Sequence, residues 1–327
     1  MPSPTLSIRD LTVDIPTRHG VLRPVSSVSY DIAPGEILGV VGESGAGKSM
    51  AGNAVIGLLS PPAHISAGEI HLGGTRIDPL KGDAMRRLRG KEIGMVFQDP
   101  LTSLNPLLKI GDQLSETMLA HLDISPSQAR SRAVAALEEV GIPGAAQRVD
   151  SYPHEFSGGM RQRVVIALAL CAEPSLIIAD EPTTALDVSV QAQIIALLKR
   201  LCRERGTAVM LITHDMGVIA EACDRVAVMY AGKLVELGPV RDVLGAPLHP
   251  YTDGLMGSTP LASRGKDRLQ QIPGAMPRLD ALPTGCAFHP RCPFVQENCK
   301  ADPGPRLRDG KGHAACYYPM MRHEVDA

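Results

Sequence analysis

Residues 42–49 read Gly-Glu-Ser-Gly-Ala-Gly-Lys-Ser and match the pattern G-x-x-x-x-G-K-[ST]. A short apolar run, Ile37–Val41, precedes them, and residues 50–59 are typical of a helix. Glycines allow a loop between a strand and a helix to curl so that its backbone N–H groups point at an anion. The positive end of the helix dipole favours the same anion. This stretch therefore predicts a phosphate-binding loop.

Each residue type in the loop has an expected role. Lys48 should reach the β- and γ-phosphates of a nucleotide, and the hydroxyl group of Ser49 should bind Mg²⁺. The candidate binding residues are Gly42, Ser44, Gly45, Gly47, Lys48 and Ser49. The loop alone leaves open which class of nucleotide-binding protein contains it.

Strand and helix signals alternate around the loop. The apolar run 176–179 lacks polar alternation, as strands of a parallel sheet do, and residues 92–97 and 209–213 are also expected to form strands. Residues 6–41 read as short strands, and residues 101–170 read as mainly helical. The pattern predicts an α/β fold with a mainly parallel sheet, an antiparallel β layer and a helical insertion at about 101–170.

Proline and glycine become more frequent after about residue 240, and hydrophobic periodicity fades. We therefore expect a core domain at 1–240 and an irregular C-terminal extension at 241–327. The formal net charge is −2, so overall charge does not recruit nucleic acid. Apolar runs all fall short of the roughly 18 residues that cross a bilayer, so a membrane role requires a partner.

Two acidic residues, Asp180 and Glu181, follow the apolar run 176–179 directly. In proteins with a phosphate-binding loop, such a pair is expected to hold Mg²⁺ through Asp180 and to polarise the attacking water through Glu181. A second glycine-containing helix start, Ser157-Gly158-Gly159, offers bare N–H groups and a small hydroxyl group to an anion. Taken by itself, this start is better explained by a simple helix cap.

Together with Gln98, Asp187 and His214, these motifs resemble those of ATP-binding cassette (ABC) ATPases. The resemblance covers residues 1 to about 240 and implies ATP and Mg²⁺ as ligands. It implies that Gln98 contacts Mg²⁺ and that Glu181, His214 and Gln98 act in hydrolysis. It also implies that Thr184–Asp187 form the segment called the D-loop in that family.

In that family, two ATPases form a head-to-tail dimer that encloses two ATP molecules. The resemblance therefore implies that Ser157, Gly158 and Gly159 contact ATP bound to the partner's phosphate-binding loop. An aromatic residue usually stacks on the adenine, but Ile15 takes that place in this chain and would supply apolar contact without π-stacking.

Further stretches, 99–106, 249–252 and 285–293, are similar to the ATPases of dipeptide, oligopeptide and nickel importers, closest to the D-type subunit of bacterial dipeptide permeases. This resemblance implies peptide import powered by ATP, with nickel or another small solute as the alternative. It implies a second homologous ATPase subunit, two membrane permease subunits and, indirectly, an external binding protein. It also implies a peripheral position at the cytoplasmic face of the inner membrane.

Other classes fit less well. A non-transport ABC ATPase would carry a long coiled-coil insertion or a second cassette, and a GTPase would carry an Asn-Lys-x-Asp loop. Neither feature occurs in the sequence.

Four of the seven cysteines, Cys286, Cys292, Cys299 and Cys316, lie in the C-terminal extension. Disulfides fit poorly with a reducing cytosol, and zinc sites usually contain closer cysteine pairs. Four reduced thiols are a further alternative. The resemblance to peptide-importer ATPases implies that these cysteines bind a [4Fe–4S] cluster.

Overall fold

The computed structural model describes residues 3–183, 187–258, 271–301 and 313–320. The chain divides into two compact units that each combine distant segments of the sequence. The first unit contains Met1–Leu6, Ile32–Glu36 and Pro79–Leu211, and the second contains Ser7–Asp31, Ile37–Asp78 and Ile212–Ala327. The expected boundary near residue 240 stays a prediction, since the two units combine segments from both sides of it.

In the first unit, the strands β8 (Ala208–Ile212), β7 (Leu176–Asp180) and β6 (Ile93–Val96) are neighbours in that order. β6 and β7 run parallel, with Ile93 opposite Leu176 and Val96 opposite Ala179. All residues of β7 before Asp180 are buried, as a strand covered on both faces requires.

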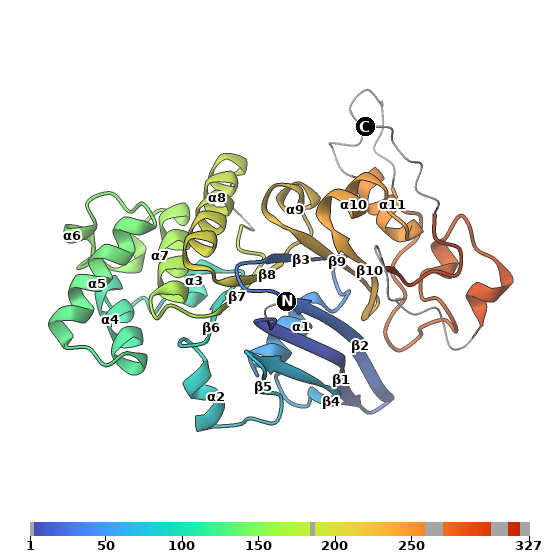
Figure 1. Ribbon diagram of the computed structural model, residues 1–327, viewed down its shortest axis with the longest axis horizontal. Coiled ribbons are helices and arrows are strands. Elements are labelled where there is room, and N and C mark those ends of the chain that lie inside the picture. Colours follow the sequence, from blue (N-terminus) through green and yellow to red (C-terminus); the bar gives the residue numbers. More distant parts are fainter. Residues whose placement is uncertain (1–2, 184–186, 259–270, 302–312, 321–327) are drawn as a thin grey trace. The chain divides into compact units, whose positions relative to one another are not determined.

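Helices make up most of the remainder of the first unit (Figure 1). They are α2 (Asp83–Leu88), α3 (Pro100–Ser103), α4 (Ile110–His121), α5 (Pro126–Glu139), α6 (Ala145–Arg148), η1 (Pro153–Glu155), α7 (Gly158–Leu170) and α8 (Val188–Arg205). The start of α5 shows why these residues form a helix. Ser125 accepts a hydrogen bond from the Gln128 N–H, and the Gln128 side chain accepts one from the Ser125 N–H.

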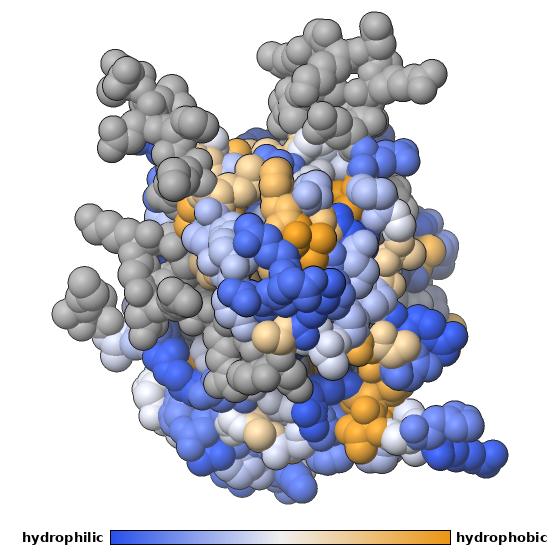
Figure 2. Space-filling model, turned by 90° about the vertical axis from the view of Figure 1, so that its right-hand side faces the viewer, coloured by the Kyte–Doolittle hydropathy of each residue, from blue (hydrophilic) through white to orange (hydrophobic). Residues whose placement is uncertain are grey.

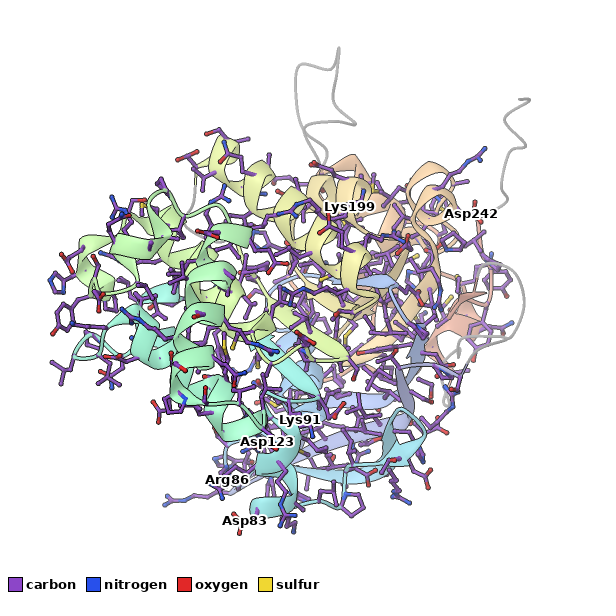
Figure 3. The ribbon with its side chains drawn as sticks, turned by 60° about the vertical axis from the view of Figure 1, so that its left-hand side comes forward. Asp83, Arg86, Lys91, Asp123, Lys199 and Asp242 are labelled. Carbon is purple, nitrogen blue, oxygen red and sulfur yellow. The ribbon has the colours of Figure 1, made fainter. Side chains whose placement is uncertain are left out.

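Surface charges support the short helix α2. Asp83 lies in its first turn and Arg86 in its last, and their side chains form an exposed ion pair at 3.2 Å (Figure 3). Each charge lies at the helix end whose dipole it complements, so the two residues favour a helix too short to be stable alone.

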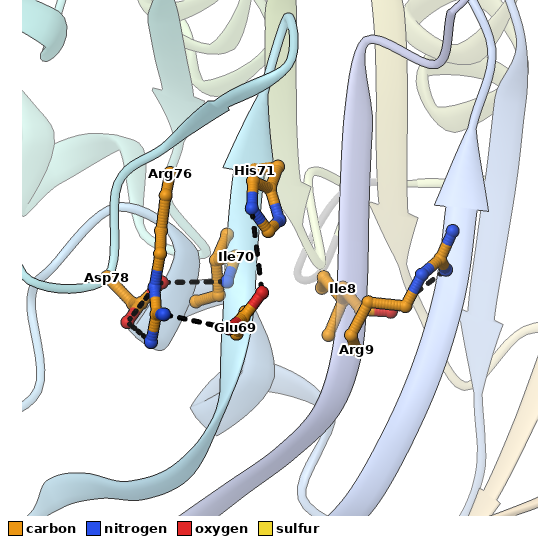
Figure 4. Close-up of polar contacts among 7 residues, drawn as sticks. All are labelled: Ile8, Arg9, Glu69, Ile70, His71, Arg76 and Asp78. Atoms are coloured by element: carbon orange, nitrogen blue, oxygen red, sulfur yellow. Dashed lines mark hydrogen bonds and ion pairs between the residues drawn. The ribbon is translucent and has the colours of Figure 1, made fainter.

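The second unit contains a four-stranded sheet of order β2-β1-β4-β5. Its strands are β1 (Leu6–Thr17), β2 (Gly20–Ile32), β4 (His64–Leu72) and β5 (Thr75–Arg76). Polar contacts connect strand β4 with strand β5 and with the residues that follow it (Figure 4). Arg76 donates to Asp78 and to Glu69, and Asp78 accepts the N–H of Ile70 at 2.9 Å. These bonds fasten the chain that leaves β5 to strand β4.

The same unit contains a run of neighbouring strands β11-β10-β9-β3. Its elements are β3 (Ile37–Val41), α1 (Lys48–Val55), α9 (Met216–Ala222), β9 (Arg225–Tyr230), β10 (Lys233–Pro239), α10 (Val240–Gly245), α11 (Pro250–Gly257), η2 (His289–Arg291), η3 (Glu297–Lys300) and β11 (His313–Ala314). β3 and β9 are parallel, whereas β9 and β10 form an antiparallel hairpin. Mixed parallel and antiparallel pairing agrees with the predicted fold class.

The C-terminal extension is largely irregular, as predicted, yet it packs on a continuous core within the second unit. Phe288 is 1% exposed and contacts the rings of Tyr230 and Tyr251 at 5.3 and 5.4 Å between centroids. Tyr230 belongs to β9 and Tyr251 to α11, so the aromatic cluster joins the extension to the sheet. The face drawn in Figure 2 mixes hydrophobic and hydrophilic areas.

None of the helices in the described ranges is long and apolar enough to cross a membrane.

Because Phe288 is buried among aromatic rings, Phe288→Ala is expected to lower the free energy of unfolding by about 3–5 kcal/mol. Phe294 lies six positions on in the same extension but is 53% exposed, so Phe294→Ala should change stability little. Denaturant unfolding of both variants measures the difference. Equal losses would show that the aromatic cluster does not stabilise the extension.

Candidate functional site

The phosphate-binding loop joins the buried strand β3 to helix α1 in the second unit. Gly42 and Gly47 have φ values of 152° and 101°. A Cβ atom on Gly42 would lie 2.2 Å from the Met229 carbonyl oxygen, and one on Gly47 would lie 2.1 Å from the Pro24 carbonyl oxygen. Only glycine fits either position, because the backbone is both left-handed and in contact with a neighbouring strand.

The loop wraps around the side chain of Lys48. This residue is 6% exposed, and its Nζ donates to the carbonyl oxygens of Gly42 at 2.8 Å and Glu43 at 3.0 Å. Lys48 is also the first residue of α1, and Ser49 follows it at the exposed start of the helix. The curled backbone, the lysine and the helix start are the arrangement that binds phosphate groups.

His214 lies in the same unit as this loop. The N–H of Thr213 donates to the carbonyl of Val40 at 3.2 Å, so the residue before His214 is bonded to the strand that leads into the loop. The side chain of His214 is exposed. Next to it, Asp215 caps α9 by accepting N–H groups of Gly217 and Val218.

Ile15 is half-buried in β1 of the second unit. Its neighbour Asp14 pairs with Arg23 at 2.8 Å, and the hydrogen bonds from Arg23 hold the pKa of the Asp14 carboxyl group below its usual value. The role of Ile15 toward adenine stays a prediction.

The acidic pair lies in the first unit, where strand register brings it to Gln98. Val96 of β6 is opposite Ala179 of β7, so Gln98 and Glu181 each lie two residues beyond a matched pair. Gln98 Nε2 donates to Glu181 Oε2 at 3.1 Å. Glu181 has φ 46°, a left-handed conformation that is uncommon for a residue with a side chain. Such strain is often found at functional positions.

The second glycine-containing helix start also lies in the first unit. Ser157 is the N-cap of α7 and accepts the Met160 N–H at 3.4 Å. A Cβ atom on Gly159 would lie 2.8 Å from Cγ1 of Val190 in α8, so the first turns of α7 and α8 touch. Asp187 caps α8, accepting the Val190 N–H at 2.9 Å and the Ser189 hydroxyl at 2.7 Å.

These contacts bring Ser157, Gly158, Gly159 and Asp187 into one region of the first unit. The hydrogen bonds that Asp187 accepts from Val190 and Ser189 lower the pKa of its carboxyl group, with the Val190 N–H as the largest cause. Residues 184–186 of the predicted loop lie outside the described residues.

The iron–sulfur prediction is wrong. The four cysteines of the extension line one cavity, together with His249, Phe288 and other residues. Nevertheless, within the described ranges no three His, Cys, Asp or Glu side chains are arranged to hold a metal ion. Burial also raises the pKa of the Cys286 thiol to about 11 and raises those of Cys292 and Cys316, which favours the protonated thiol over the thiolate that binds metal.

Sequence reasoning missed three residues of the extension that reach the phosphate-binding loop. Tyr251, Met276 and Arg291 contact Glu43 or Gly45. The stretches 249–252 and 285–293 carry a family resemblance but no local pattern that predicts contact with the loop. The sequence carries no local signal for the Arg291 contact, because its partner Glu43 lies 248 positions away.

Comparison with known proteins agrees with this geometry. The family profile described as "ABC transporter" matches residues 25–184, and that described as "Oligopeptide/dipeptide transporter, C-terminal region" matches residues 235–299. The dipeptide transport ATP-binding protein DppD of Bacillus subtilis is 46% identical over 98% of this chain and 96% of its own length. The oligopeptide transport ATP-binding protein OppD of Escherichia coli is 47% identical over 96% of this chain and 93% of its own.

Among solved structures, a dimeric ATP-binding cassette, MJ0796, bound to ADP and Pi in a post-hydrolysis state, is similar. It has a TM-score of 0.65 and 28% identity and covers 72% of this chain and 99% of its own length. The predicted α/β cassette fold is thereby confirmed. The chain belongs to the ATP-hydrolysing ATP-binding proteins of the ABC transporter family, in the branch that carries the oligopeptide/dipeptide transporter C-terminal region.

Proposed function

We propose that this chain is the ATP-hydrolysing subunit of a bacterial importer of dipeptides or oligopeptides. The observation that carries the proposal is similarity along the whole chain to dipeptide and oligopeptide transport proteins, including the C-terminal region at residues 235–299. A cassette shared with unrelated transporters would match only the ATP-binding part.

The proposed partners follow from this role. A second, homologous ATPase subunit would complete the dimer, and two membrane permease subunits would hold the pair at the cytoplasmic face of the inner membrane. An external binding protein would deliver the peptide. The dimeric structure of the similar cassette supports the first of these partners.

Within the cassette, we assign the phosphates of ATP to the loop 42–49 and its Lys48. Ser49 and Asp180 are proposed as Mg²⁺ ligands, because hydroxyl and carboxylate oxygens suit this ion, and Gln98 is proposed beside them. Ser157, Gly158, Gly159 and Asp187 are proposed to meet ATP bound to the partner subunit, and Ile15 the adenine. The helix start at Ser157 presents N–H groups that suit a phosphate.

Hydrolysis is proposed to depend on Glu181 as the general base, with Gln98 and His214 in supporting roles. The hydrogen bond from Gln98 orients the Glu181 carboxylate, since the amide holds one of its two oxygens at 3.1 Å. A glutamate carboxylate oriented in this way can accept a proton from the attacking water.

Glu181→Gln is expected to reduce ATP hydrolysis about 10²–10⁴-fold while leaving ATP binding intact, because a carboxamide does not accept the proton. Hydrolysis by the assembled transporter and ATP binding by the chain are the two measurements. Glu173→Gln is a matched control: Glu173 is an exposed glutamate in the same unit and also has a positive φ, 58°. Turnover of Glu181→Gln near the wild-type rate would remove Glu181 from this role.

Gln98→Glu places a second carboxylate against Glu181. Like charges at this distance disfavour ionisation, so the base should become active only at higher pH. The acidic limb of the pH–rate profile is therefore expected to move to higher pH, while Gln98→Ala should lower the rate without moving that limb. Gln147→Glu, an exposed position on α6, serves as the control. An unmoved limb in Gln98→Glu would show that the two side chains are apart during hydrolysis.

The transported solute is tested by uptake. Cells or proteoliposomes containing the transporter should accumulate a radiolabelled dipeptide, and Lys48→Ala in this chain should abolish the accumulation. Uptake of nickel ions in place of the dipeptide, with the same dependence on Lys48, would replace the peptide by nickel as the substrate.

A further inference from the structure

The C-terminal extension touches the phosphate-binding loop at a charged pair. Arg291 is the last residue of η2. Its Nη1 lies 2.9 Å from Oε2 of Glu43, the second residue of the loop. The Arg291 side chain is only 7% exposed. The same Nη1 donates to the Tyr230 hydroxyl group at 3.3 Å. A pair this well covered is weakly screened by salt and is costly to break from one side.

Backbone carbonyl groups fix the guanidinium group. Nε donates to the carbonyl of Pro273 at 2.9 Å, and Nη2 donates to those of Ile272 and Gly274 at 3.4 Å. The guanidinium also lies over the rings of Tyr230 and Phe288, at 5.8 and 5.9 Å from their centroids. The position of the Arg291 guanidinium group beside Glu43 is therefore fixed by the extension itself, since most of its N–H groups donate to carbonyl groups of the extension.

Two further contacts reach the same loop from the extension. The buried Tyr251 of α11 accepts the N–H of Glu43 on its hydroxyl oxygen at 2.9 Å. Met276 covers Gly45, because a Cβ atom there would lie 3.1 Å from the Met276 Cε. Three separate segments of the extension thus contact Glu43 or Gly45 of the loop.

Because Glu43 is negatively charged, these contacts affect how the loop binds an anion. A carboxylate within a loop that binds a polyanion opposes the binding, because like charges repel. Arg291 neutralises this carboxylate and turns it toward the extension. The Tyr251 hydroxyl fixes the backbone of the same residue.

We propose that the C-terminal extension holds the phosphate-binding loop in its nucleotide-binding form through Arg291 and Tyr251. In this role Arg291 is a positioning residue, which acts on the nucleotide through Glu43. The proposal rests on the assignment of residues 42–49 as the loop that binds the phosphates of ATP.

Titration of the full-length chain with a fluorescent ATP analogue, mant-ATP, tests the proposal. Arg291→Met is expected to weaken binding about tenfold, because it leaves the Glu43 carboxylate uncompensated. Tyr251→Phe keeps the buried ring and removes only the acceptor of the Glu43 N–H, so it should weaken binding about threefold. Arg291→Lys keeps the charge but loses the fork of donors, and should give an intermediate affinity.

A double-mutant comparison with Glu43 distinguishes a positioning role of Arg291 from a role only in stabilising the fold. If Arg291 acts by neutralising Glu43, the same Arg291→Met change should matter much less in a Glu43→Gln background. A merely structural arginine would cost the same affinity in both backgrounds, and that result overturns the proposal. In the assembled transporter, Arg291→Met should raise the KM for ATP more than it lowers kcat.

Controls identify the cause of any failure. Arg278→Met removes an arginine of the same extension whose side chain is 83% exposed and pairs with Asp280, and it should leave affinity unchanged. Lys48→Ala must weaken binding strongly; if it does not, the assignment of the loop is at fault rather than the role of the extension. Thermal unfolding reports whether Arg291→Met folds. If it does not, Tyr251→Phe decides, and unchanged affinity in that variant overturns the proposal.

Discussion

The absence of side chains at two positions of the phosphate-binding loop is the constraint on which the second unit depends. Gly42 lies against the Met229 carbonyl of β9, and Gly47 lies against the Pro24 carbonyl of β2. One strand belongs to each sheet of the unit, so both sheets shape the same loop. The close approach lets the loop fold around Lys48, whose Nζ is held by the carbonyls of Gly42 and Glu43. A methyl group at either glycine would force the strands and the loop apart.

Parallel register has a corresponding effect in the first unit. Parallel strands end at the same edge of a sheet, so polar residues that follow them by equal numbers of positions meet there. This is why Gln98 and Glu181 are hydrogen-bonded although 83 positions separate them. The left-handed backbone at Glu181 shows that the chain turns sharply at this point. We connect that geometry with the proposed base because it directs the carboxylate to the amide of Gln98.

The C-terminal extension shows how a segment with little regular secondary structure becomes ordered. Phe288 packs against the rings of both Tyr230 and Tyr251, and Arg291 donates to carbonyl groups of its own segment while pairing with Glu43. Hydrophobic burial and a largely buried ion pair stabilise this part of the extension, where a sheet would use hydrogen bonds between strands. The same burial keeps the thiols near Cys286 protonated, which agrees with the correction of the iron–sulfur prediction.

The sequence by itself determined the features whose interactions lie within a few residues. The Ser125–Gln128 capping box, the Ser157 helix cap and the buried strand that ends at Asp180 were all predictable, because cap and turn chemistry is local. Ordered motifs also identified the cassette and its candidate residues. Only the tertiary structure decided that Arg291 pairs with Glu43 and that the four cysteines do not form a metal site. The sequence shows where a charged group or a thiol lies along the chain. Which group becomes its partner depends on how distant segments of the chain pack together.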